Sequence, residues 1–251
     1  MVVSSLKRRQ ILFYDERREE GLTVDIPSTD YVKKTFGVKL STSDVILDAG
    51  CGVCSHLLSL NCGEKVGLDI LLGNLTVAKN RSKKLRLIRG DVESLPFKDG
   101  TFDAVLIVSV LHHVPNHELA LNEICRVIRE GGYLFIADSS VTGIKLIYPL
   151  AVIIQYFGSL LGSPESFGPK LDELYCLLKK NGFAVFRYES CTSFISFIFR
   201  SLEGFTRRFG ILNLLIYATE GSFRSLDSKV LSKVGANFGL WFNLVAIKNK
   251  L

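Results

Sequence analysis

The sequence predicts an α/β protein whose core is a doubly wound, mostly parallel sheet of seven strands. Short apolar runs recur along the 251 residues, and segments with helical spacing separate the first five of them. Runs that are almost entirely apolar are typical of strands buried on both faces of a sheet. Strands that alternate with helices form right-handed βαβ units. Such sheets bind ligands at the carboxyl ends of their strands.

The strands follow one another in a regular order from Asp44. The first run, DVILDAG, ends in a glycine turn, and the second, KVGLDI, ends beside an acid. The fourth and fifth, AVLIVSV and YLFIAD, are nearly all apolar. We expect strands over residues 44–50, 65–70, 85–92, 104–110 and 133–138, with two more over 183–190 and 240–249.

The clearest helix lies in the stretch ELALNEICRVIREGG. Leu121, Ile124, Cys125 and Ile128 form one apolar stripe with helical spacing. Gly131 follows this stripe, and glycine is common just past the end of a helix. We therefore expect Gly131 to cap the helix.

Helical additions should flank the sheet within a single domain over residues 1–251. We expect a helical cap over 1–40, a cofactor-binding core over 41–140 and a helical lid over 141–181. An apolar and basic stretch over 191–239 separates the last two strands and is too long for a hairpin. It predicts inserted helices that form a lid or a docking surface.

One part of the lid, residues 144–161, is apolar enough to raise the question of a transmembrane helix. It contains Lys145 and Pro149, and its uncharged part is at most about as long as one bilayer-spanning helix. A lid or core helix is therefore the better interpretation.

The formal charge of +6 is concentrated at one end of the chain. Residues 191–251 hold eight Lys or Arg against three acids, so the remainder is nearly neutral. A basic region rich in Phe, Ile and Leu suits a membrane surface at least as well as a nucleic acid. The charged N-terminal stretch argues against export, and six scattered cysteines fit a reducing compartment. We expect a cytoplasmic protein, with peripheral membrane association as an option.

The stretch DAGCGVC at residues 48–54 permits two readings. Cys51 and Cys54 form a C-x-x-C, whereas Gly50 and Gly52 form a glycine loop after the first strand. The chain has no second C-x-x-C to complete a four-cysteine zinc site, so we expect no metal. A dinucleotide fingerprint would need a third glycine where Ser55 stands, which disfavours a nicotinamide dehydrogenase. The glycines then form a loop that lets a ligand approach the backbone.

The run LDAGCG resembles motif I of the class I S-adenosylmethionine-dependent methyltransferases. The segment GDVESLPFKDGTFDAVLIVSVLHHVPN, at residues 90–116, is similar to the type 11 and quinone-biosynthesis methyltransferases, and RVIREGGYLFIAD continues the similarity. The resemblance covers about residues 40–140 and implies a Rossmann-like fold with S-adenosylmethionine as cofactor. Cys54 departs from the pattern, because the family usually has its third glycine there.

The resemblance also implies roles for individual residues. Asp48 would face the cationic end of the cofactor, and the amides around Gly50 and Gly52 would approach its carboxylate. Asp69 would accept hydrogen bonds from the ribose hydroxyls, and Asp91 would accept one from the adenine amino group. The complete set of cofactor-binding residues that we expect is Asp48, Gly50, Gly52, Asp69, Ile70, Asp91, Val92 and Ser109.

Methyl transfer from a sulfonium requires an aligned acceptor and, where the acceptor carries a proton, a base. His112 and His113 are the candidate catalytic residues. Adjacent residues on a helix point about 100° apart, so we expect the two rings to face different directions. Pro115 interrupts any regular relation to His117, which makes a zinc site improbable. Tyr14 is a weaker candidate that could close over the cofactor.

The accessory segments suggest a hydrophobic small-molecule or lipid-like acceptor. Two alternatives remain open. The first is a tRNA wobble-uridine side-chain methyltransferase that needs a small activator protein. The second is a non-catalytic subunit that binds S-adenosylmethionine. The partners that we expect are therefore the acceptor, with a membrane surface or an activator protein as options and nucleic acid less favoured.

Overall fold

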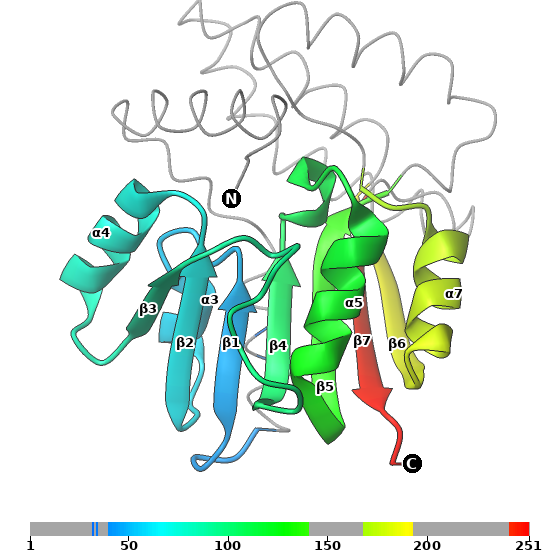
Figure 1. The fold of residues 1–251 in the computed structure, drawn as a ribbon, viewed down its shortest axis with the longest axis horizontal. Helices are drawn as coiled ribbons and strands as arrows, with labels where there is room; N and C mark the ends of the chain where they lie inside the picture. Colours follow the sequence, from blue (N-terminus) through cyan, green and yellow to red (C-terminus); the bar gives the residue numbers. More distant parts are fainter. Residues whose placement is uncertain (1–31, 33, 35–39, 141–167, 193–240, 251) are drawn as a thin grey trace, which may run out of the picture.

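The computed structural model describes residues 32, 34, 40–140, 168–192 and 241–250, which form a sheet with helices on both faces (Figure 1). The strands lie in the order β3-β2-β1-β4-β5-β7-β6. The first five are parallel, and β7 runs antiparallel to both of its neighbours. This confirms the predicted seven-stranded, mostly parallel sheet. The strands are β1 (Val45–Ala49), β2 (Glu64–Asp69), β3 (Arg86–Arg89), β4 (Phe102–Val108), β5 (Ile128–Ser139), β6 (Phe183–Thr192) and β7 (Trp241–Lys248).

The helices form two layers, one on each face of the sheet. Figure 1 shows α5 and α7 in front of the sheet and α3 behind it. Leu121 of α5 and Leu174 of α7 belong to one hydrophobic core, whereas Leu57 of α3 and Leu75 of α4 belong to the other. The helices are α3 (Ser55–Ser59), α4 (Leu72–Arg81), α5 (His117–Val127) and α7 (Leu171–Lys180), with a short 3-10 helix, η1 (Leu111–His113).

Alternate residues of the central strands point into the two cores. Leu47 and Val105 face the core under α5, whereas Ile46 and Leu106 face the core over α3, and all four are fully buried. Successive side chains of a strand point to opposite faces, so a strand buried on both faces must be apolar throughout. This is why the strands could be recognised as nearly continuous apolar runs.

Helix α5 ends earlier than predicted. Its last residue is Val127, and Ile128 already belongs to β5, where it pairs with Phe102 of β4. The Nζ of Lys248, on β7, donates to the carbonyl oxygens of Cys125 and Ile128 at 2.8 and 2.7 Å. A residue distant in sequence therefore satisfies the carbonyls at this helix end. The prediction of Gly131 as the cap was wrong, because Gly131 lies within β5 with φ +72°.

Several predicted additions lie outside the described residues. These are nearly all of the cap over 1–40, including Tyr14, most of the lid over 141–181, and nearly all of the insertion over 191–239. Helix α7 falls within the predicted lid, but its buried Leu174 and Leu178 pack in the core on the α5 face of the sheet. Residues 171–180 are therefore part of the layered fold. Within the described ranges, no helix is long and apolar enough to cross a membrane.

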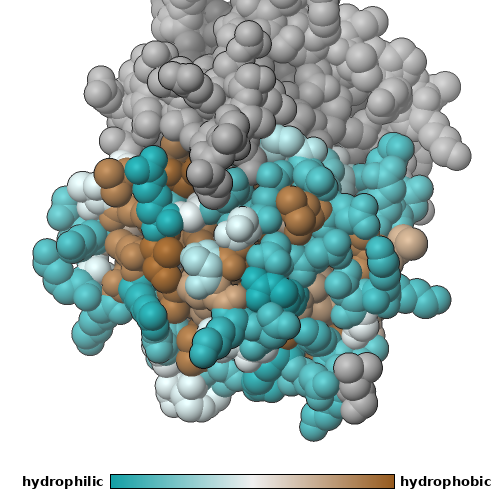
Figure 2. Space-filling view, in the orientation of Figure 1, coloured by the Kyte–Doolittle hydropathy of each residue, from teal (hydrophilic) through white to brown (hydrophobic). Residues whose placement is uncertain are grey.

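The face of the molecule that is seen in Figure 2 differs in hydropathy between its two halves. Figure 2 shows a largely hydrophilic surface over α5 and α7, and hydrophobic residues among hydrophilic ones toward the β1–β3 end. At that end β3 is joined to β4 by an irregular segment, residues 90–101, in place of a helix. Phe97 of this segment packs edge-on against Phe102, with ring centroids 4.8 Å apart. The segment thus covers part of the sheet with its own apolar side chains.

Candidate cofactor site

Backbone hydrogen bonds to β2 fix the glycine loop that follows β1. The amides of Gly50 and Cys51 both donate to the carbonyl oxygen of Leu68 on β2, at 2.7 and 2.9 Å. Gly50 has φ +85°, and a Cβ on it would overlap the Cγ2 atom of Val110. Only glycine fits at this position, because the backbone is left-handed and packed against a side chain.

Asp69, the last residue of β2, joins the glycine loop to the turn that follows β2. One carboxylate oxygen accepts from the amide of Gly52 at 2.8 Å, and the other accepts from the amide of Leu71 at 2.8 Å. Asn74 Nδ2 lies 3.4 Å from the second oxygen. Asp69 therefore binds the loop after β1 and the turn after β2 at once.

Asp48 is the most unusual residue of the site. Its side chain is fully buried, and neither carboxylate oxygen has a hydrogen-bond partner among the described residues. Burial, followed by the nearby carboxylate of Asp69, raises the pKa of Asp48 to about 8. A buried carboxylate without hydrogen bonds or a counter-charge is strongly disfavoured, so Asp48 is a neutral acid at pH 7 in this structure.

The two cysteines of the loop point toward the sheet. A Cβ on Gly67 of β2 would lie 2.8 Å from the sulfur of Cys54 and 2.9 Å from that of Cys51, so the missing side chain makes room for both. The hydrogen bond to Cys54, together with burial, raises the pKa of the Cys51 thiol far above its usual value. A thiol of this kind does not form the reactive thiolate. Across the described segments, no group of three or more His, Cys, Asp or Glu could hold a metal ion.

Cys54 has a backbone conformation that favours glycine. Its φ is +61°, and it precedes the first residue of α3. Ser109, after β4, has φ +59°, and its amide donates to the carbonyl oxygen of Ala137 at 2.8 Å. Left-handed conformations of such residues are costly and cluster at functional sites. Among the described residues these are the only two outside glycine, and both lie in loops at the carboxyl ends of parallel strands.

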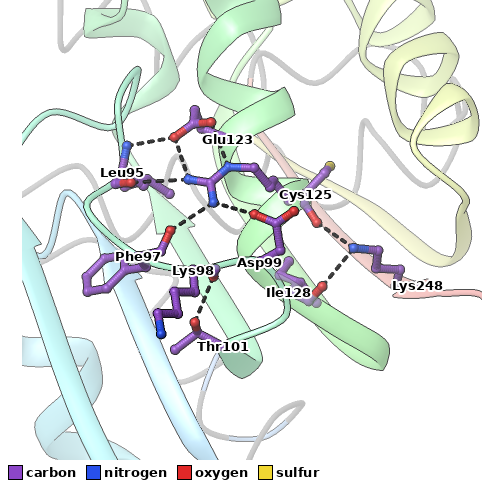
Figure 3. A network of polar contacts seen from close by, with 10 residues as sticks. Leu95, Phe97, Lys98, Asp99, Thr101, Glu123, Cys125, Ile128 and Lys248 are labelled. Carbon is purple, nitrogen blue, oxygen red and sulfur yellow. Dashed lines mark hydrogen bonds and ion pairs between the residues drawn. The ribbon is translucent and has the colours of Figure 1, made fainter.

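A polar network holds the segment that follows β3. Arg126 of α5 donates to the carbonyl oxygens of Leu95 and Phe97 at 3.1 and 2.8 Å, and to Asp99 at 2.7 Å (Figure 3). Glu123, one turn earlier, pairs with Arg126 and accepts from the amide of Leu95 at 2.8 Å. At the start of the same segment, Asp91 accepts from the amide of Glu93 at 3.0 Å, and the side chain of Val92 is buried. The helix thus positions the loop that carries Asp91 and Val92.

Asp138, near the end of β5, holds the turn after β4. It is fully buried, and its Oδ2 accepts from the amides of Val110 and Leu111 at 3.0 and 2.7 Å. Its Oδ1 lies 2.6 Å from Nδ1 of His112 and accepts from the amide of Ser139 at 2.7 Å. Burial opposes ionisation of Asp138, but His112 and these hydrogen bonds outweigh it and lower the pKa of Asp138. Asp138 is therefore an ionised acceptor, and Nδ1 of His112 carries a hydrogen.

The two histidines do not point apart as expected. Their ring centroids are 3.8 Å apart, with an angle of 51° between the planes. Adjacent residues of a 3-10 helix such as η1 also point well apart, about 120°, so the closeness of the rings comes from the side-chain orientations, and Asp138 fixes that of His112. Burial and the neighbouring His112 hold the pKa of His113 well below its usual value. His113 is therefore neutral at physiological pH.

Known proteins share this sequence pattern and this fold. The family model of a methyltransferase domain matches residues 47–136. The demethylmenaquinone methyltransferase of Staphylococcus haemolyticus is 30% identical over 185 residues, which are 64% of this chain and 77% of that protein. The chain is an S-adenosylmethionine-dependent methyltransferase.

Two further comparisons concern another relative and a solved structure. The phthiotriol/phenolphthiotriol dimycocerosates methyltransferase 1 of Mycobacterium ulcerans is 32% identical over 164 residues, which are 60% of this chain and 57% of that protein. The structure of phosphoethanolamine N-methyltransferase 2 from Haemonchus contortus, a complex with S-adenosylhomocysteine, matches with a TM-score of 0.64 at 17% identity. That match covers 99% of this chain and 61% of the other, and it supports the fold.

The residues of this methyltransferase fit the family's cofactor, S-adenosylmethionine. The buried carboxyl of Asp48 lacks a partner among the described residues, and a Cβ on Gly52 would meet nothing within 4 Å. The loop therefore leaves open space beside a buried acid. In this structure the amides of Gly50 and Gly52 donate to the carbonyl oxygen of Leu68 and to the carboxylate of Asp69.

The structure brings most of the expected residues to one edge of the sheet. Asp48, Asp69 and Ser109 lie at or after the carboxyl ends of three adjacent parallel strands, and Asp91 follows β3 in the same way. The sequence analysis gave no role to Asp138. A signal was present, since YLFIAD ends in an acid at the carboxyl end of a strand.

Replacing Gly52 by alanine distinguishes a loss of room for the cofactor from a loss of protein stability. Gly52 (φ +52°) and Gly182 (φ +77°) both have left-handed backbones and room for a Cβ, but Gly182 lies in the turn before β6. Each alanine variant should lose about 1 to 2 kcal/mol of unfolding free energy, the cost of this conformation for an L-residue. Only Gly52→Ala should also weaken S-adenosylmethionine binding, by about tenfold or more, which is roughly 1.4 kcal/mol. Calorimetry and urea unfolding check both values, and equal affinities for the two variants would contradict a cofactor loop at Gly52.

The raised pKa of Asp48 predicts how stability depends on pH. Between the unfolded value of 3.8 and the folded value of about 8, the folded state binds the proton that the unfolded state has lost. The unfolding free energy of the ligand-free protein should therefore decrease as pH rises through this range, by up to about 1.4 kcal/mol per pH unit from this group. Asp48→Asn should remove that component. Parallel pH dependences in urea unfolding of the two proteins would show that Asp48 is ionised in the fold.

Proposed function

We propose that this methyltransferase acts on a hydrophobic small-molecule or lipid-like acceptor. The observation that carries this proposal is the kind of relative that it matches. One relative is named for demethylmenaquinone, a quinone, and another for phthiotriol dimycocerosates, which are lipid-like. The chain's apolar, basic stretch at 191–239 is consistent with such an acceptor. Peripheral contact with a membrane and a small activator protein are further proposals, and both would follow from an apolar accessory surface.

The cofactor roles that we propose use the carboxyl ends of the parallel strands. Asp69 would accept from the ribose hydroxyls, and Ile70 follows it in the same turn. Asp91 would accept from the adenine amino group, beside the amide of Val92. Ser109 would line the floor near the methyl group. The support is their common edge of the sheet and the fixed geometry of each loop.

For acceptors that carry a proton, we propose His112 as the base and Asp138 as the residue that positions it. The ionised Asp138 accepts a hydrogen bond from Nδ1–H of His112, so a neutral His112 has its lone pair on Nε2. His113 is the weaker candidate. Burial and the neighbouring His112 hold its pKa well below the usual value, whereas the 2.6 Å contact with Asp138 fixes the orientation of His112.

Substitution of Asp69 tests the cofactor site. Asp69→Ala should weaken S-adenosylmethionine binding by about 1 to 3 kcal/mol, the scale of a buried hydrogen-bonding group left unpaired. Asp103 is a suitable control, because it is also an acid bonded to a backbone amide, that of Val45, and it lies near the amino end of β4. Calorimetric titration should find wild-type affinity for Asp103→Ala. A similar loss in both variants would point to general destabilisation.

A methyl-transfer assay with labelled cofactor tests the acceptor class. We expect label in the organic extract when a demethylated quinone or a hydroxylated lipid is supplied, and none in added tRNA. Label in tRNA that disappears steeply as salt rises would overturn the hydrophobic acceptor and favour the nucleic-acid alternative, since phosphate contacts are salt-dependent. Cofactor binding without transfer to any acceptor, with or without an activator protein, would favour a non-catalytic subunit.

The pH profile of the reaction tests His112 and Asp138. His112→Ala should lower kcat by about 10²- to 10⁴-fold, the usual contribution of a general base. Asp138→Asn should lower kcat and move the acidic limb of the profile to lower pH, because a carboxylate partner favours the protonated imidazole. His113→Ala serves as the control and should affect kcat less. An unchanged acidic limb in Asp138→Asn would leave that residue a structural role only.

A further inference from the structure

Asp48 is an acid in a place where acids are rarely tolerated without a partner. It is fully buried at the carboxyl end of β1, and both of its oxygens lack hydrogen-bond partners in the described part of the chain. Asp69, one strand away, has three donors within 3.4 Å, so the two neighbouring acids differ sharply in environment. The protein thus stabilises a negative charge on Asp69 and provides no such stabilisation for one on Asp48.

The groups that surround Asp48 do not supply the missing charge. Among the described residues, those that act on it electrostatically are Asp69 on β2 and the Cys51 thiol in the loop, and neither is a cation. Its partner on β4 is the apolar Leu106. Burial and Asp69 raise the pKa of Asp48 to about 8, so most of this group carries a proton at pH 7. A ligand that brings positive charge to this edge of the sheet would change that balance.

The two forms of the cofactor differ in charge at one atom. S-adenosylmethionine has a positively charged sulfonium, whereas the sulfur of S-adenosylhomocysteine is neutral. Both have an amino acid end whose ammonium and carboxylate groups largely cancel each other. The sulfonium is therefore the charge that Asp48 can sense as a difference between the two ligands.

We propose that Asp48 releases its proton when S-adenosylmethionine binds and keeps most of it when S-adenosylhomocysteine binds. This inference rests on the proposed cofactor site, in which Asp48 faces the cationic end of the ligand. The proton passes to solvent, and the carboxylate that remains stabilises the sulfonium. Asp48 would thereby favour the methylated cofactor over the spent one, and this preference would grow with pH.

Titration calorimetry in two buffers of different ionisation enthalpy measures the released proton directly. At pH 7.0, in phosphate and in Tris, the wild type should release close to one proton per S-adenosylmethionine and clearly less per S-adenosylhomocysteine. Asp48→Asn should release about one proton fewer than the wild type with S-adenosylmethionine. The variant also corrects for titration of the ligand's own amino group, because that contribution is common to both proteins.

The ratio of the two affinities provides a test that needs no variant. Between pH 6 and pH 8 the affinity for S-adenosylmethionine should rise relative to that for S-adenosylhomocysteine, approaching tenfold per pH unit at the acidic end. Binding of both ligands with equal proton release, or with a ratio that is independent of pH, would overturn the role of Asp48 and leave the cofactor site intact. Failure of the folded wild type to bind either ligand would overturn the cofactor site itself and this proposal with it.

Discussion

The organisation of the site depends on the carboxylate of Asp69. It is the last residue of β2, yet its oxygens bind the amide of Gly52 in the loop after β1 and the amide of Leu71 at the start of α4. Two loops from adjacent strands are therefore held at a fixed separation by one side chain. The glycine loop can then remain open at Gly52, because its position does not require a side chain of its own.

The buried carboxylate of Asp138 holds another loop by its amides, on the other side of β1. Asp138 binds the amides of Val110 and Leu111 and the imidazole of His112, and so fixes the turn that follows β4. Val110 in turn packs against Gly50. Asp48 lies between these two partnered acids without a partner of its own among the described residues. Asp69 and Asp138 thus each hold loop amides with their carboxylates, whereas Asp48 holds none among the described residues.

Much of this arrangement could be predicted from the sequence because it depends on local patterns. Strands buried on both faces are apolar throughout, and Gly50 and Asp69 occupy the positions that a ligand loop requires. The errors came from contacts between distant residues. The helix ends at Val127, where Ile128 enters the sheet and Lys248 of β7 binds the carbonyl oxygen of Cys125. The rings of His112 and His113 lie together beside Asp138. The left-handed backbone of Cys54 was not predicted, although its place in the motif, where the family usually has glycine, was a hint.

A crystal structure of the complex with S-adenosylhomocysteine tests the central claim most directly, namely that the cofactor binds at the carboxyl ends of β1, β2 and β4. The account predicts ligand density over Gly52, with both ribose hydroxyls within hydrogen-bonding distance of Asp69, about 2.5 to 3.2 Å. Density at another face of the sheet, or a ribose bound without Asp69, would contradict it.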